Sequence, residues 1–191
     1  IKNSENPVKD IINDGTIEFK NVSFKYPFAS GDLILENISI KINKGETIGI
    51  LGETGSGKST FVNLIPRLYD VTEGEILIDG VNVKNIDLDY LRNEIGIVLQ
   101  KAILFSGTIK DNIKWGKKDA TDEEVFNAAK KAQAYDFIMD TPDKFETKLG
   151  QMGVNLSGGQ KQRISIARTL IKKPKILILD DSTSAVDTAT E

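Results

Sequence analysis

The chain has 191 residues, of which 39% are hydrophobic, enough for one domain of ordinary size with a substantial core. No apolar run approaches membrane-spanning length, and a net charge of −3 is too small to imply broad attraction to nucleic acid or anionic lipid. The absence of Cys and His excludes disulfides, thiolate metal sites and histidine catalysis within the chain, so acid–base chemistry must fall to carboxylates.

The N-terminal part of the chain predicts a linker followed by two strands. Residues 1–15 are polar and are interrupted by Pro7 and Gly15, which is typical of a linker. Apolar residues alternate with polar ones over residues 16–26 and again over residues 38–42. This period of two predicts half-buried antiparallel strands.

Three later segments, residues 47–51, 95–99 and 175–179, are short and almost continuously apolar. Such runs are typical of strands that helices cover on both faces. A glycine-rich turn and a predicted helix over residues 59–68 follow the first of them.

Two capping-box pairs predict helices in the second half of the chain. Thr121 and Glu124 precede a helix extending to about Ala134, and Ser157 and Gln160 precede another. The apolar stripe of the second helix consists of Ile164, Ala167 and Ile171. The predicted fold class is therefore α/β, with a mostly parallel sheet core, an N-terminal antiparallel β part and a helical subdomain.

The segment "GETGSGKST" (52–60) fits the pattern G-x-x-x-x-G-K-[ST] between a predicted strand and a predicted helix. Its glycines let backbone N–H groups surround phosphate oxygens, Lys58 would reach the β- and γ-phosphates, and Ser59 would bind Mg²⁺. The alternative is a glycine-rich turn that contains a lysine by chance, which the strand-to-helix context disfavours. The residues expected to bind nucleotide here are Gly52, Thr54, Gly55, Ser56, Gly57, Lys58, Ser59 and Thr60.

Polar residues follow the other two apolar runs: Gln100 after one, and Asp180 and Asp181 after the other. Ligands of open α/β sheets lie at the carboxyl ends of strands. We expect Asp180 to hold Mg²⁺ and Asp181 to orient or deprotonate an attacking water. The alternative is that both are solvated residues at a strand end, and the phosphate loop favours the functional interpretation.

The segment "LSGGQ" (156–160) raises a separate question. Ser157 and Gln160 alone make an ordinary helix start, but Gly158 and Gly159 in the first turn each lower helix stability. Two glycines are useful there if a phosphate must approach the backbone closely.

The string "NLSGGQKQRISIARTLIKKPKILILDDSTSAVD" resembles the signature, helix, Walker B and D-loop of the nucleotide-binding domain of an ATP-binding cassette (ABC) transporter. The resemblance covers nearly the whole chain and implies a P-loop NTPase fold that binds ATP and Mg²⁺. It divides the chain into a linker from a preceding transmembrane domain, an ATP-binding core and a helical subdomain. These span residues 1–15, residues 16–100 with 173–191, and residues 101–172.

The resemblance also implies a head-to-tail dimer in which each ATP lies between one Walker A loop and the partner's signature. Tyr26 would stack on adenine, although an edge-strand tyrosine is the competing interpretation. Gln100 would be a Q-loop residue with catalytic and Mg²⁺-binding roles, and Asp187 would belong to the D-loop. The signature residues that would bind the partner's ATP are Ser157, Gly158, Gly159 and Gln160, with Ser157 and Gly159 at the γ-phosphate.

The segments 104–113 and 149–160 are similar to those of exporters, which implies transmembrane domains as partners and a place on the cytoplasmic side of the membrane. Gln151 stands where that group usually has Glu, which weakens the expected coupling contact. The chain stops before the family's switch histidine and before a strand that lies between the Walker A and Walker B strands, so we expect the C-terminal part of the family fold to be absent.

Asp181 occupies the position where the family has a catalytic Glu. Its carboxylate is shorter by roughly 1.5 Å, and misplacement of about 1 Å can cost about a hundredfold in rate. This replacement is similar to the degenerate site of heterodimeric exporters. The resemblance therefore implies an exporter ATPase domain with a slow site of its own. The alternatives are a non-hydrolysing ATP-dependent dimerisation module and a soluble ABC ATPase.

Overall fold

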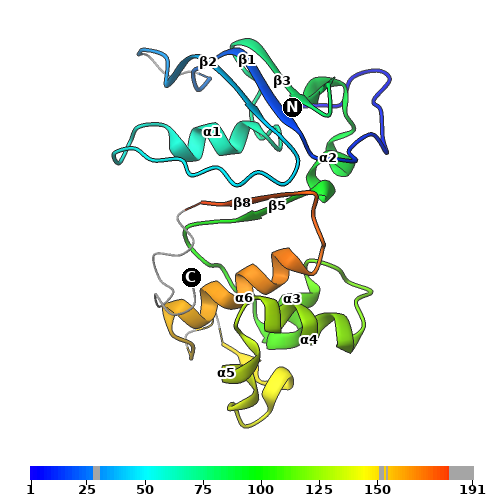
Figure 1. Ribbon diagram of the computed structural model, residues 1–191. Coiled ribbons are helices and arrows are strands. Elements are labelled where there is room, and N and C mark those ends of the chain that lie inside the picture. Colours follow the sequence, from blue (N-terminus) through cyan, green and yellow to red (C-terminus); the bar gives the residue numbers. More distant parts are fainter. Residues whose placement is uncertain (28–30, 151–152, 154, 181–191) are drawn as a thin grey trace. The chain divides into compact units, whose positions relative to one another are not determined.

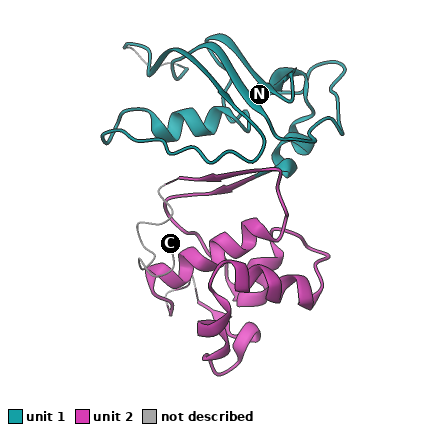
Figure 2. Ribbon diagram, viewed as in Figure 1, with its two compact units in different colours: residues 1–95 teal, residues 96–191 magenta. Residues whose placement is uncertain are grey.

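The computed structural model describes residues 1–27, 31–150, 153 and 155–180. The chain divides into two compact units, residues 1–95 and 96–191 (Figure 2). The expectations for Gln151, Asp181 and Asp187 fall outside the described residues. Within the described part of the chain, no helix combines the length and the apolar character needed to cross a membrane.

The first unit contains four strands: β1 (Ile17–Phe24), β2 (Leu35–Ile42), β3 (Glu73–Ile78) and β4 (Val81–Asn82). They form one sheet in the order β2-β1-β3-β4, and every neighbouring pair is antiparallel. Figure 1 labels the first three of these strands. Strand β1 pairs with β2 on one side and with β3 on the other, so that Phe19 lies opposite Ile40 and Ile76. The predicted antiparallel β part is thus confirmed.

Helix α1 (Lys58–Leu64) packs on this sheet through Phe61, whose ring stacks on that of Phe19 at 4.4 Å. The helix ends before the predicted Leu68, because Pro66 lacks an N–H donor and Arg67 adopts a positive φ of 51°. The remaining elements of this unit are the 3₁₀ helix η1 (Val83–Asn85) and helix α2 (Leu88–Glu94).

The prediction of a strand over residues 47–51 is wrong for this structure. The segment joins none of the sheets of the described residues, and Leu51 is 96% exposed. An apolar run becomes a buried strand only where neighbouring strands pair with its backbone and helices cover its side chains. Among the residues that the structure describes, neither condition is met for this segment.

Residues 1–16, most of which were expected to be a linker, contact the body of the first unit at several points. Ile12 is buried, and Val8 forms an isolated parallel bridge with Ile86. The Asp79 carboxylate accepts hydrogen bonds from the backbone N–H groups of residues 13–16 at 2.7–3.1 Å. These contacts hold the segment against the turn between β3 and β4.

The second unit contains a helical part with one buried apolar core. Both predicted capping boxes are present, at Thr121 with Glu124 and at Ser157 with Gln160. The first of these helices ends at Lys131, earlier than predicted, and Gln133 then adopts a positive φ of 53°. The elements are β6 (Gly107–Thr108), α3 (Ile109–Lys114), α4 (Asp122–Lys131), α5 (Tyr135–Met139), η2 (Lys144–Glu146), β7 (Lys148–Leu149) and α6 (Gly158–Leu170).

Helix α6 packs against α3 and α4 (Figure 1). Its predicted apolar stripe is buried, with Ile164 and Ala167 at 0% exposure and Ile171 at 3%. Burial of this stripe stabilises the helical part.

Strands β5 (Ile95–Val98) and β8 (Ile176–Leu179) form a separate two-stranded sheet. The Asp180 backbone N–H donates to the Val98 carbonyl at 2.9 Å, so the carboxyl ends of the two strands are adjacent, as in a parallel pair. The described residues thus form an α/β fold, as the sequence predicted, but the parallel part of the sheet structure is limited among them to the β5–β8 pair.

Candidate functional site

The loop before α1 has the backbone shape of a phosphate-binding turn. Gly55 and Gly57 have positive φ angles of 85° and 90°, which glycine adopts without steric strain. Gly57 is the N-cap of α1 and leaves the first N–H groups of the helix without a side-chain cap. A Cβ atom at Gly52 would lie 2.6 Å from the Ser56 hydroxyl oxygen, so a larger residue there would require the Ser56 side chain to move. The loop can therefore present backbone N–H groups to an anion.

The Lys58 side chain folds back over the same loop. Its Nζ donates to the carbonyl oxygens of Gly52 and Glu53 at 2.7 and 2.8 Å. The next residue, Ser59, is exposed. A cation and an accessible hydroxyl thus stand side by side at the start of α1, which suits the binding of phosphate and a hard divalent cation.

Tyr26 lies beside this helix, two residues after the end of β1. Its hydroxyl is 3.1 Å from the Thr60 hydroxyl, which connects the ring to the last residue of the loop motif. The ring also makes edge-on contacts with Phe24 and Tyr69, at 4.9 and 5.0 Å between centroids. The tyrosine is only half-buried. Both interpretations of Tyr26, a nucleotide contact and a member of an aromatic cluster, are compatible with this geometry.

In the second unit, Gln100 and Asp180 follow the two strands whose carboxyl ends are adjacent. An amide oxygen and a carboxylate at the same end of a sheet are hard oxygen ligands, which Mg²⁺ prefers. The chemistry of the residues therefore fits the metal that the sequence predicts.

The signature segment forms the N-terminus of α6. The Ser157 Oγ accepts from the Gln160 N–H at 3.2 Å, and Gln160 Oε1 accepts from the Ser157 N–H at 3.0 Å. Ser157 and Gly158 are exposed. The ordinary helix cap is present, and next to it Gly158 is exposed while Gly159 is half-buried.

Two polar residues of α6 that the sequence analysis did not select are buried against β5. Gln162 is 2% exposed and Thr169 is 7% exposed. They lie seven residues apart, which places them on one face of the helix. Their spacing in the sequence, next to the apolar stripe of the same helix, could have indicated that both side chains are buried.

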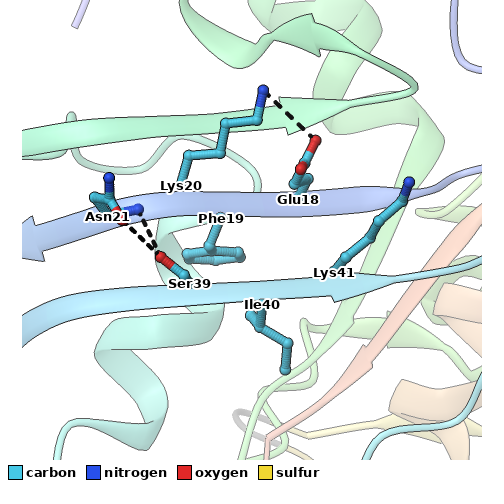
Figure 3. A pocket seen from close by; sticks show the side chains of 7 residues that line it. All are labelled: Glu18, Phe19, Lys20, Asn21, Ser39, Ile40 and Lys41. Atoms are coloured by element: carbon cyan, nitrogen blue, oxygen red, sulfur yellow. Dashed lines mark hydrogen bonds and ion pairs between the residues drawn. The ribbon is translucent and has the colours of Figure 1, made fainter.

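A shallow surface pocket lies on β1 and β2, away from the phosphate loop in sequence (Figure 3). Five of its seven lining residues are polar or charged, and several pair with one another: Lys20 contacts Glu18 at 3.7 Å, and the Ser39 hydroxyl donates to Asn21 at 2.9 Å. It contains none of the predicted site residues. The residues that line it are Glu18, Phe19, Lys20, Asn21, Ser39, Ile40 and Lys41.

Comparison with known proteins supports the resemblance to the ABC transporter family. A family model described as "ABC transporter" matches residues 35–184. The chain is 54% identical over 177 residues to YgaD of Bacillus subtilis, whose name describes a multidrug export ATP-binding/permease protein. The alignment covers 93% of this chain and 30% of that protein. The chain is also 50% identical over 178 residues to human ATP-binding cassette sub-family B member 5, covering 93% of this chain and 14% of the human protein.

Among solved structures, a bacterial Atm1-family ABC exporter with ATP bound is similar over the whole chain, with a TM-score of 0.94 and 42% sequence identity. The match covers 33% of that exporter chain. This chain therefore spans a third or less of the length of the proteins it matches here.

Proposed function

Because this chain belongs to the ABC transporter family, we propose that it is the ATP-binding domain of an exporter and uses Mg·ATP to drive transport across a membrane. The observation that carries the proposal is the glycine loop at the start of α1, with the Lys58 ammonium held against its carbonyls. The domain would work on the cytoplasmic side of the membrane, joined to transmembrane domains. The names of YgaD and the Atm1-family structure support an exporter.

The residues of the loop have separate roles in this proposal. Backbone N–H groups between Gly52 and Gly57 surround the phosphates, and Lys58 binds the β- and γ-phosphate oxygens. Tyr26 contacts adenine by stacking. Its edge-on neighbours hold the ring in place, and its link to Thr60 ties it to α1.

Ser59, Gln100 and Asp180 would hold Mg²⁺. The ion supplies positive charge that neutralises the β- and γ-phosphates. The support in this structure is the chemistry of the oxygen ligands and the adjacent ends of β5 and β8. Asp181 orients the attacking water or removes its proton.

The signature acts on the ATP of a second nucleotide-binding domain. Ser157 and Gly159 contact its γ-phosphate, and Gly158 and Gln160 complete the loop around it. The exposure of Ser157 and Gly158 at the N-terminus of a 13-residue helix supports this role, because helix N-termini attract anions.

The partner domain is a different subunit with a competent catalytic carboxylate. The support is the residue type at position 181, where an Asp is one methylene too short for the base position that the resemblance implies. The assembly then has one slow site, built on the loop of this chain, and one fast site that this chain's signature completes.

Nucleotide-driven pairing tests the function directly. This chain contains no Cys, so Asn155→Cys, exposed next to the signature, can carry a single spin label once cysteines elsewhere in the full-length transporter are replaced. The distance between this label and one on the partner domain should shorten with Mg·ATP and not with Mg²⁺ alone. An unchanged distance would overturn the proposal. Shortening without ATP turnover, whichever partner is supplied, would favour the non-hydrolysing dimerisation module.

A further inference from the structure

Helix α6 reaches the backbone immediately before Gln100 through a buried side chain. The Gln162 amide Nε2 donates to the Leu99 carbonyl at 3.1 Å, and the Gln162 side chain is almost fully buried. Leu99 is the first residue after β5, and its carbonyl belongs to the peptide bond that joins it to Gln100. The hydrogen bond therefore fixes one side of the Gln100 backbone.

The same helix also holds the segment that follows Gln100. Arg168 Nη1 donates to the Ile103 carbonyl at 2.8 Å, and Arg168 Nη2 donates to the Asn112 Oδ1 at 2.8 Å. The Asn112 side chain in turn bonds both backbone groups of Phe105, at 2.8 and 2.9 Å. Asn112 is 1% exposed, and burial lowers the pKa of Arg168 from its ordinary value without removing its charge.

The Gln162 and Thr169 hydrogen bonds contribute differently to the stability of this region. A buried amide that loses its acceptor, or a buried carbonyl that loses its donor, costs far more than an exposed one. Thr169 makes a weaker contact to β5. Its hydroxyl lies 3.3 Å from the Ile97 carbonyl and 3.1 Å from the Ser165 carbonyl, so one donor is divided between two acceptors. Thr169 thus binds β5 three residues before Gln100, at a point where the strand already pairs with β8.

We propose that Gln162 is a positioning residue for Gln100: it holds the Leu99 carbonyl and so keeps Gln100 beside Asp180 at the carboxyl end of the β5–β8 pair. The inference rests on the proposed function, in which Gln100 and Asp180 bind Mg²⁺. Through this contact, the helix that carries the signature sets the geometry of a metal ligand in its own subunit. Gln162 itself touches neither nucleotide nor metal.

The test uses the full-length transporter and the near-isosteric variant Gln162→Leu, which removes the N–H donor and keeps the volume. The Mg²⁺ concentration that half-saturates binding of a fluorescent ATP should rise roughly three- to tenfold, because the variant loses one hydrogen bond that positions Gln100. Binding of the same probe without Mg²⁺ should stay unchanged. Amide hydrogen exchange in residues 99–105 should become faster even without metal or nucleotide.

Thr169→Val is the matched control. It removes a hydrogen bond from the same helix to Ile97 in β5, two residues before Leu99, and keeps the side-chain shape. It should lower thermal stability slightly and leave the Mg²⁺ dependence unchanged. If both variants shift the Mg²⁺ dependence equally, the effect is general loosening of the helix and the proposal is overturned.

Gln162→Glu provides a second variant with a pH signature. The ionised carboxylate cannot donate to the Leu99 carbonyl, whereas the protonated acid can, and burial raises the pKa of such a group. The Mg²⁺ affinity of Gln162→Glu should therefore recover relative to wild type as the pH falls. A defect that does not depend on pH contradicts the positioning role.

A double variant separates this inference from the proposed function. Because Gln162 acts through Gln100, Gln100→Ala with Gln162→Leu should be no worse than Gln100→Ala alone. Additive losses overturn the positioning role and leave the role of Gln100 intact. If Gln100→Ala does not change the Mg²⁺ dependence, the assigned metal role of Gln100 fails, and the positioning inference fails with it.

Discussion

The Lys58 ammonium lies 2.7 Å from the Gly52 carbonyl oxygen, so the side chain spans the phosphate loop from the first residue of α1 to the first residue of the motif. A second bond to the Glu53 carbonyl, at 2.8 Å, holds it there. The positive charge is therefore positioned at the loop by the backbone of the loop itself.

Lys58→Ala should weaken ATP binding about 10- to 100-fold, the loss of charge-assisted hydrogen bonds to phosphate. Equilibrium binding of a fluorescent ATP to the 191-residue chain measures the change. Lys58→Arg retains the charge but not the compact shape, and should fall between wild type and Lys58→Ala. Unchanged affinity in Lys58→Ala would remove the assignment of the loop as the nucleotide site.

Tyr26 allows the ring to be separated from the hydroxyl. Tyr26→Phe loses only the contact with Thr60, whereas Tyr26→Ala also loses the ring, whose stacking on a base is worth about 1–3 kcal/mol. We expect ATP affinity to be nearly unchanged in Tyr26→Phe and to fall about 5- to 100-fold in Tyr26→Ala. Equal effects of the two changes in the binding titration would argue against stacking.

Ser157→Arg should leave ATP binding to the isolated chain intact and block ATP-driven pairing with the partner domain, because the larger side chain would fill the surface that we propose faces the partner's phosphate. The change also removes the Ser157 cap of α6, which costs about 1 kcal/mol. Ser157→Ala removes the same cap without added bulk, so its thermal stability gives the matched baseline. Loss of the chain's own ATP binding in Ser157→Arg would show that the signature does not act on the partner's nucleotide.

Asp181→Glu should raise ATP turnover at this chain's own site, measured in the full assembly with the partner's site inactivated. The gain is limited to about a hundredfold to ten-thousandfold, the range of general-base catalysis. Asp181→Asn should change little, because a slow site has little base catalysis to lose. If Asp181→Asn abolishes most of the turnover, Asp181 is a working base and the slow-site proposal is wrong.

Asp79→Asn should destabilise the chain by about 1–3 kcal/mol at neutral pH, since the amide cannot accept all four backbone N–H groups of residues 13–16. Burial acts to raise the pKa of Asp79, but these four hydrogen bonds outweigh it and hold the pKa below its ordinary value of 3.8. The stabilisation is therefore complete above the unfolded-state pKa and is lost as the pH falls through the folded-state pKa.

Urea unfolding at pH 7 and below pH 4 measures this difference. The difference in unfolding free energy between wild type and Asp79→Asn should become smaller at acidic pH. Asp32→Asn, a change at an exposed carboxylate in the same unit, is the control and should have little effect at either pH. A gap that is independent of pH would contradict the role of the charge.

Several features were determined by short stretches of sequence. The capping boxes at Thr121 and Ser157, the alternation in β1 and the glycines of the phosphate loop each depend on residues a few positions apart. Local hydrogen bonds and side-chain periodicity decide such features, so the sequence predicts them and their boundaries to within a few residues.

Contacts between distant residues were decided only by the tertiary structure. Asp79 meets residues 13–16 from more than 60 positions away, and Gln162 meets the Leu99 carbonyl across 63 positions. The apolar run 47–51 predicted a buried strand, yet the segment is exposed in the structure. Burial and pairing depend on which elements the chain brings together, and no local pattern encodes the partner of a backbone carbonyl or of a buried amide.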